Sequence, residues 1–138
     1  MIDNKCKNKL YCLTSLLDIV LLFILCNYNL NYFDLFFSIS LLISHTLFFY
    51  GLIYYNKKLL DYLHVYVFIS VILSLFLTNK ILIGLCLFFT ITLQVLWIIE
   101  NKCILNEEGE TTGMSKTISL GTLFINTILA YKLGKIVS

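Results

Sequence analysis

Asp18 and His45 are the two residues in this 138-residue chain whose types and positions indicate proton chemistry. Each lies near the middle of a long apolar run, where an ionisable side chain is costly and needs a partner. If the two runs form antiparallel neighbouring helices, the two side chains lie at similar depth. They are then expected to form a charge-assisted hydrogen bond. Thr14 and Ser15, one turn before Asp18, are candidates for the same polar face.

Gln94 and Asn126 also lie within apolar runs, and together with Asp18 and His45 they form a predicted intramembrane polar cluster. One interpretation is a proton or ion relay through Asp18 and His45. A second is interhelical hydrogen bonding that fixes which helices pack together, and a third is tolerance of lipid-facing polar groups. Relays usually contain several acids along a path, whereas here only Asp18 lies deep in a run. The packing role is therefore favoured.

Metal and cofactor chemistry has little support in the sequence. His45 and His64 are expected at different depths, which is poor geometry for sharing a haem iron. The cysteines form no C-x-x-C pair or zinc-ligand spacing, and their odd number does not fit complete disulfide pairing. We expect all of them to be free thiols that pack as small apolar groups: Cys6, Cys12, Cys26, Cys86 and Cys103.

No catalytic motif is found either. The stretch "GETTGMSKT" (109–117) has glycines and a lysine, but their spacing does not meet the phosphate-loop pattern. The sequence therefore predicts no cofactor, no metal site and no catalytic residue. A net charge of +2 without a basic stripe gives no reason to expect a nucleic-acid partner.

Half of the acidic residues lie in one short polar stretch, residues 100–116. Glu107 and Glu108 follow Asn106 near a candidate helix start, which fits a solvated connector with helix-capping groups. The same acids also fit a docking loop for a basic partner. Both interpretations concern the same four residues: Glu100, Glu107, Glu108 and Glu110.

The elements that must position these residues are apolar helices. With 59% hydrophobic and 13% charged residues, a chain this short cannot cover itself with a polar surface. Long apolar runs without strand-like alternation predict an all-α, polytopic transmembrane bundle forming a single domain. The alternative to five spans is four spans with an interfacial C-terminal helix. The predicted spans are 10–27, 33–55, 60–78, 81–99 and 117–133.

Lysine placement predicts a cytoplasmic N-terminus and a cytoplasmic loop at 100–116. Acids barely affect orientation, so this loop can hold them. The lysines expected on the other side are Lys80, Lys132 and Lys135, against seven on the cytoplasmic side: Lys5, Lys7, Lys9, Lys57, Lys58, Lys102 and Lys116. Small residues recur every four positions in several spans, which suits close packing within the chain or in a homo-oligomer: Ser40 and Ser44, Ser70 and Ser74, and Gly113, Thr117 and Gly121.

The segment 97–108, a Trp-bearing helix end followed by "NKCILNEE", resembles small multi-pass membrane proteins of large, AT-rich nucleocytoplasmic DNA viruses. It is also similar to bacterial membrane proteins in which Cys-Pro-Leu-Thr and a nearby Glu follow a span. Cys103 and Leu105 match that pattern, while Ile104 and Asn106 replace Pro and Thr, and Glu108 falls one place early. The viral resemblance implies a virion, assembly or host internal membrane and implies no reaction.

Three functions compete. The first is a structural or interaction protein of the lipid bilayer that contacts other membrane or capsid proteins. The second is a small transporter, channel or proton pathway using Asp18 and His45. The third is a membrane enzyme acting through Cys103, beside which no base is visible. The absence of catalytic motifs and of large soluble parts favours the first.

Overall fold

A computed structural model describes residues 4–100 and 113–137 of the chain. The described parts are helical throughout, apart from short turns, so the all-α prediction is confirmed. The elements are α1 (Asn4–Asn27), α2 (Tyr32–Ile53), α3 (Lys57–Leu73), the 3-10 helix η1 (Ser74–Phe76), α4 (Lys80–Glu100) and α5 (Gly113–Val137).

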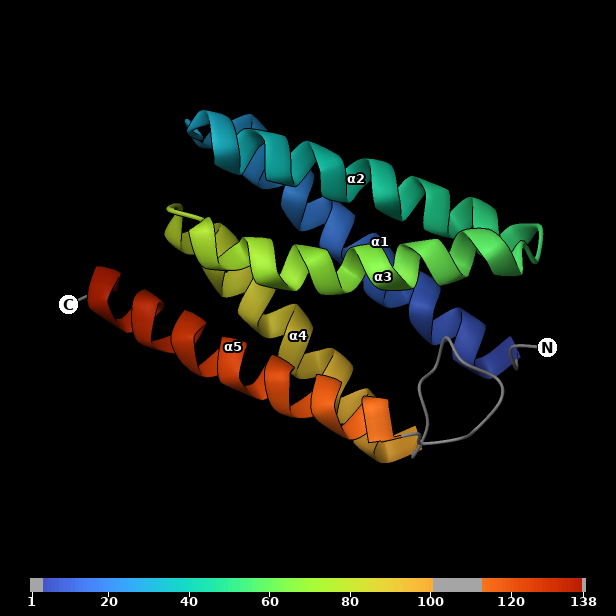
Figure 1. Ribbon diagram of the computed structural model, residues 1–138. Coiled ribbons are helices and arrows are strands. Elements are labelled where there is room, and N and C mark those ends of the chain that lie inside the picture. The colour runs from blue at the N-terminus through green and yellow to red at the C-terminus, as the bar shows by residue number, and fades with distance from the viewer. Residues whose placement is uncertain (1–3, 101–112, 138) are drawn as a thin grey trace.

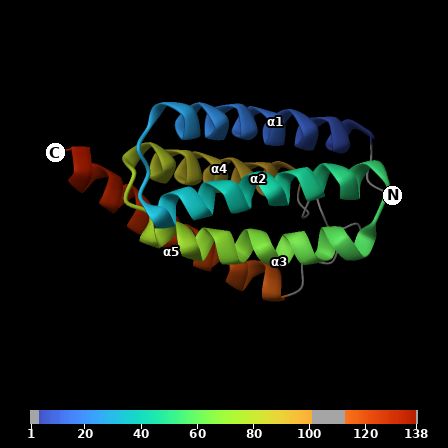
Figure 2. The same cartoon turned by 90° about the horizontal axis from the view of Figure 1, so that it is seen from above.

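The helices run up and down in turn, as Figures 1 and 2 show from two directions. The chain's N-terminus and the α2–α3 turn lie at one end of the bundle, which we call the N end. The α1–α2 and α3–α4 connections and the C-terminus lie at the opposite end, the C end. The two termini are therefore at opposite ends.

Among the described residues, three helical segments are long and apolar enough to cross a membrane: Asn8–Asn27, Tyr32–Ile53 and Lys57–Phe76. The segment Lys80–Leu96 of α4 is apolar but shorter. The last helix, α5, has 25 residues, and at 1.5 Å per residue it is roughly 37 Å long. It lies alongside α4.

Large apolar side chains are exposed on every side of the bundle. Ile19 on α1, Phe36 on α2 and Phe124 on α5 are 65%, 67% and 68% exposed. Phe76 and Phe88 add exposed rings near the α3–α4 connection and on α4. A water-soluble monomer rarely exposes so much apolar surface. The described helices are thus consistent with a protein embedded in a membrane.

The buried core lies toward the C end. Leu21 and Ile24 of α1 pack with residues of α2, the α3–α4 connection, α4 and α5 that are 0–2% exposed. A smaller cluster joins Leu10, Leu52 and Leu60, from α1, α2 and α3. The α-helices therefore pack against one another most closely at the C end.

The turn between α2 and α3 ends the second span earlier than the predicted residue 55. The last helical residue is Ile53, and Tyr55 takes a positive φ of 52°. The N–H of Asn56 donates to the carbonyl of Gly51, the bond that closes a Schellman motif. Asn56 then accepts from the N–H of Leu59 and caps α3.

Two other predicted boundaries differ from the structure. The predicted third span reaches residue 78, but its α-helix ends at Leu73 and continues as η1. Residues 113–116 belong to α5 and not to the predicted loop, so the last helix is longer than the predicted span. The first helix begins at Asn4, six residues before the predicted start at residue 10, and the other predicted bounds lie within four residues of the helix ends.

Candidate functional site

Asp18 of α1 and His45 of α2 are in direct contact, which their similar predicted depths had made possible. The Nδ1 of His45 lies 2.6 Å from Oδ1 of Asp18. The side chains of His45 and Asp18 are 13% and 22% exposed, so the pair is mostly enclosed between the two helices. A carboxylate accepts, and Nδ1 therefore carries the shared proton. In a neutral ring this leaves Nε2 unprotonated.

The two hydroxyls expected beside this pair are not part of it. Ser15 is exposed on the outer face of α1, because it lies nearly on the opposite side of the helix from buried Leu17 and Leu21. Thr14 is buried. Within the described residues neither hydroxyl bonds to Asp18, so the predicted polar face reduces to the Asp18–His45 pair.

Asn126 and Gln94 form a second polar contact, between α5 and α4. The Nδ2 of Asn126 donates to Oε1 of Gln94 at 3.1 Å, and its Oδ1 contacts the hydroxyl of Thr90. Thr90 and Asn126 are 2% and 6% exposed. No hydrogen bond between described residues joins this group to Asp18 or His45. The predicted cluster of four is therefore two separate interhelical contacts.

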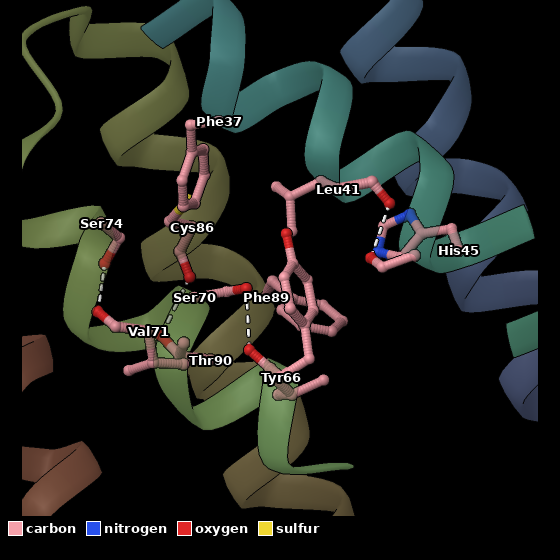
Figure 3. A pocket seen from close by; sticks show the side chains of 12 residues that line it. Phe37, Leu41, His45, Tyr66, Ser70, Val71, Ser74, Cys86, Phe89 and Thr90 are labelled. Carbon is pink, nitrogen blue, oxygen red and sulfur yellow. Dashed lines mark hydrogen bonds between the residues drawn. The ribbon is translucent and has the colours of Figure 1, made fainter. Parts of the chain in front are cut away.

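A cavity of about 50 Å³ lies between α2, α3 and α4, and touches both polar groups. His45 and Thr90 are both on its wall, as are Ser44, Ser70 and Ser74. Figure 3 shows Tyr66 and Ser70 of α3 around it, with His45 at its edge. Ser40, which precedes Ser44 by four residues, is not on this wall but accepts from the Tyr66 hydroxyl. Gly121 of α5, also expected to pack closely, has open space where a Cβ would be.

Asp34 is the polar residue that the sequence analysis missed. It is 1% exposed at the start of α2, and its carboxylate accepts from the N–H and hydroxyl of Thr78 and from the N–H of Asn79. Asn31 caps α2 and also donates to the Thr78 hydroxyl. The available signal was an acid in the first turn of a capped helix, which does not reveal partners 44 and 45 residues away.

Lys132 of α5 also binds the α3–α4 connection. Its ammonium donates to the carbonyls of Leu75 and Leu77, at 2.8 and 2.5 Å. These carbonyls belong to the end of the α3–η1 segment, where a cation is favourable. A carboxylate from α2 and an ammonium from α5 therefore fix the α3–α4 connection together.

The structure offers no metal site within its described ranges: no three His, Cys, Asp or Glu side chains there are placed to hold an ion. Cys12, Cys26 and Cys86 are free thiols. Cys6 and Cys103 lie where side chains are not described.

The side chains of the acidic loop also lie outside the described residues. Glu100 ends the α4 backbone, and Glu107, Glu108 and Glu110 fall between the described ranges.

Within residues 4–100 and 113–137, fold and site together define an all-helical bundle in which three helices are long and apolar enough to span a membrane and polar side chains hydrogen-bond between helices. Comparison with known proteins gave no match to a family model, a curated protein or a solved structure.

Proposed function

We propose that this protein is a non-enzymatic membrane protein that crosses the bilayer five times and serves a structural or interaction role. The observation that carries the proposal is that the buried polar side chains hydrogen-bond within the bundle. Every fully buried side-chain nitrogen or oxygen among the described residues has a hydrogen-bond partner. Helix-to-helix and helix-to-turn bonds use the polar side chains to hold the bundle together, while apolar side chains face outward.

Five crossings are supported by the opposite positions of the two termini and by exposed tyrosines at both ends. Tyr32 and Tyr131 are 95% and 73% exposed toward the C end, and Tyr54 and Tyr62 are 67% and 75% exposed toward the N end. Tyrosine favours the two membrane–water interfaces. The lysine distribution supports a cytoplasmic N end.

Single-cysteine labelling in a background without native thiols tests this topology. Lys5→Cys, Tyr54→Cys and Glu110→Cys are expected to react from the cytoplasmic side, and Tyr28→Cys from the opposite side. A four-span protein would instead place the C-terminus on the cytoplasmic side, so Lys135→Cys separates the two topologies. Labelling of positions 5 and 110 from opposite faces would contradict the five-span proposal.

The interaction role is proposed for the acidic loop at 100–116, which would bind a basic partner. The resemblance at 97–108 supports a virion or assembly membrane as the membrane in which the protein lies. A photo-crosslinking residue at 107 or 110 is expected to capture a basic membrane or capsid component in intact membranes. The same residue at position 28, beyond the opposite face, is the matched control. Equal capture at both positions would remove the proposed docking role.

A proton pathway is the second candidate, and the 2.6 Å contact between Asp18 and His45 beside a cavity favours it. Purified protein in liposomes carrying a pH-sensitive dye separates the two roles. A pathway predicts proton flux that Asp18→Asn abolishes while the fold survives. A structural protein predicts no flux above that of empty liposomes.

A further inference from the structure

The cavity between α2, α3 and α4 is bordered by polar groups whose protons are already in use. The hydroxyls of Ser44, Ser70 and Ser74 donate to backbone carbonyls three or four residues earlier in the chain, at 2.8, 2.9 and 2.6 Å. The Tyr66 hydroxyl donates to Ser40 at 2.8 Å. Each oxygen therefore keeps only its acceptor capacity.

The imidazole of His45 adds another acceptor. Its Nδ1–H is directed to Asp18, so the neutral ring presents a lone pair at Nε2. No hydrogen bond among the described residues uses Nε2. Every fully buried side-chain nitrogen or oxygen in these residues has a hydrogen-bond partner, so Nε2 cannot be fully buried. Nε2 is therefore not sealed off, and His45 is part of the cavity wall.

We propose that this cavity holds water that donates a hydrogen bond to Nε2 of His45 and supplies it with protons. The space of about 50 Å³ is sufficient, since one water needs roughly 10–15 Å³. Apart from the weakly donating thiol of Cys86, the polar wall consists of acceptors, which suits a small hydrogen-bond donor. Phe37, Leu41, Val67, Val71 and Phe89 make the rest of the wall apolar and confine water to the polar positions.

Proton uptake at this site is chemically simple. A hydronium ion gives one proton to Nε2, leaving water and an imidazolium whose Nδ1–H still pairs with the Asp18 carboxylate. The other titratable groups that face the ring or its cavity are Tyr66 and Cys86. Hydration of His45 does not require that protons cross the membrane, so the inference is independent of the proposed function.

The chain has two histidines, which makes ¹⁵N-histidine NMR of the full protein in nanodiscs a direct test. The variant His64→Gln leaves His45 as the sole signal. At a pH where the ring is neutral, we expect the Nδ1–H tautomer and cross-peaks between water and the His45 ring protons. An Nε2–H tautomer, or a ring without water cross-peaks, would overturn the proposal.

Ser70→Leu fills the cavity and removes a hydroxyl that bonds only to its own helix. It is expected to abolish the water cross-peaks and keep the Nδ1–H tautomer. Ser15→Leu, on the exposed face of α1, is the matched control and should keep them. If Ser70→Leu does not fold, Val67→Leu adds one carbon to the same wall and should weaken the cross-peaks. Unchanged cross-peaks in a folded cavity-filling variant would show that water reaches His45 by another route and would refute the assignment.

Discussion

The carboxylate of Asp34 accepts both the backbone N–H and the hydroxyl of Thr78, at 3.1 and 2.8 Å, across 44 residues of sequence. It binds the N–H of Asn79 as well, at 2.9 Å. These bonds supply acceptors for the first free N–H groups before α4. An almost fully buried charge at one end of the bundle therefore anchors the start of one helix to the start of another.

Asp34→Ala is expected to lower the free energy of unfolding by about 2 kcal/mol or more. Three donors lose a charged acceptor, and a hydrogen bond to a charged group contributes about 1.5–3 kcal/mol. Because Thr78 is exposed, water replaces part of what is lost. Thermal unfolding in detergent measures the effect. Asp61→Ala removes an exposed aspartate from α3 and should change stability little. Equal losses in the two variants would show that Asp34 has no special structural role.

Asn126→Leu is expected to loosen α5 from α4. The loss should be about 1 kcal/mol, because interhelical hydrogen bonds in membranes average near 0.6 kcal/mol. The matched variant Asn27→Leu removes an exposed amide that bonds only within its own helix. Comparing the two by chemical denaturation in micelles isolates the α4–α5 contact, and an unchanged midpoint for Asn126→Leu would contradict its proposed role.

Tyr55→Gly is expected to stabilise the protein by about 1 kcal/mol, since the left-handed conformation costs an L-residue about 1–2 kcal/mol and glycine almost nothing. Removal of the tyrosine ring and its packing offsets part of the gain. Tyr54 has a φ of −93°, so Tyr54→Gly should destabilise instead. Melting temperatures of both variants provide the check. A decrease for Tyr55→Gly as large as that for Tyr54→Gly would contradict this account.

Gly51→Ala is expected to destabilise the α2–α3 contact. A methyl group at this position would lie 2.9 Å from Cδ2 and 3.2 Å from Cγ of Leu60, so a buried side chain must move. Gly121→Ala meets open space in α5 and should stabilise that helix by about 0.5–1 kcal/mol. If Gly121→Ala instead lowers stability or changes the oligomeric state, that face of α5 contacts another molecule.

Asp18→Asn is expected to keep the bundle folded because the amide oxygen still accepts from Nδ1–H of His45. Asp18→Leu leaves that N–H without a partner and should lower the melting temperature, with a cost of about 1 kcal/mol or more. Leu16→Asn, on the exposed face of α1, controls for a new amide in the span. Similar melting temperatures for Asp18→Asn and Asp18→Leu would show that the pair contributes no packing energy.

The sequence by itself determined the class of structure. Apolar runs of helical length, joined by links such as "YNLN" and "TNK", predict long antiparallel helices because lipid leaves backbone groups no other partner. The equal depth of Asp18 and His45 was also predictable, since the short link between the two apolar runs makes their helices adjacent and antiparallel. Backbone hydrogen bonding and chain connectivity fix both features locally.

Only the tertiary structure decided how the helices are rotated and which distant residues meet. The helices are apolar on almost every side, so no stripe in the sequence marks the face that packs inward. For this reason the sequence could not separate Asn126 and Gln94 from the Asp18–His45 pair. Nor could it show that Lys132, expected among the lysines outside the membrane, would bind the carbonyls of Leu75 and Leu77. The partners of Asp34 and Lys132 depend on the packing of all five helices around the α3–α4 connection, which no local pattern encodes.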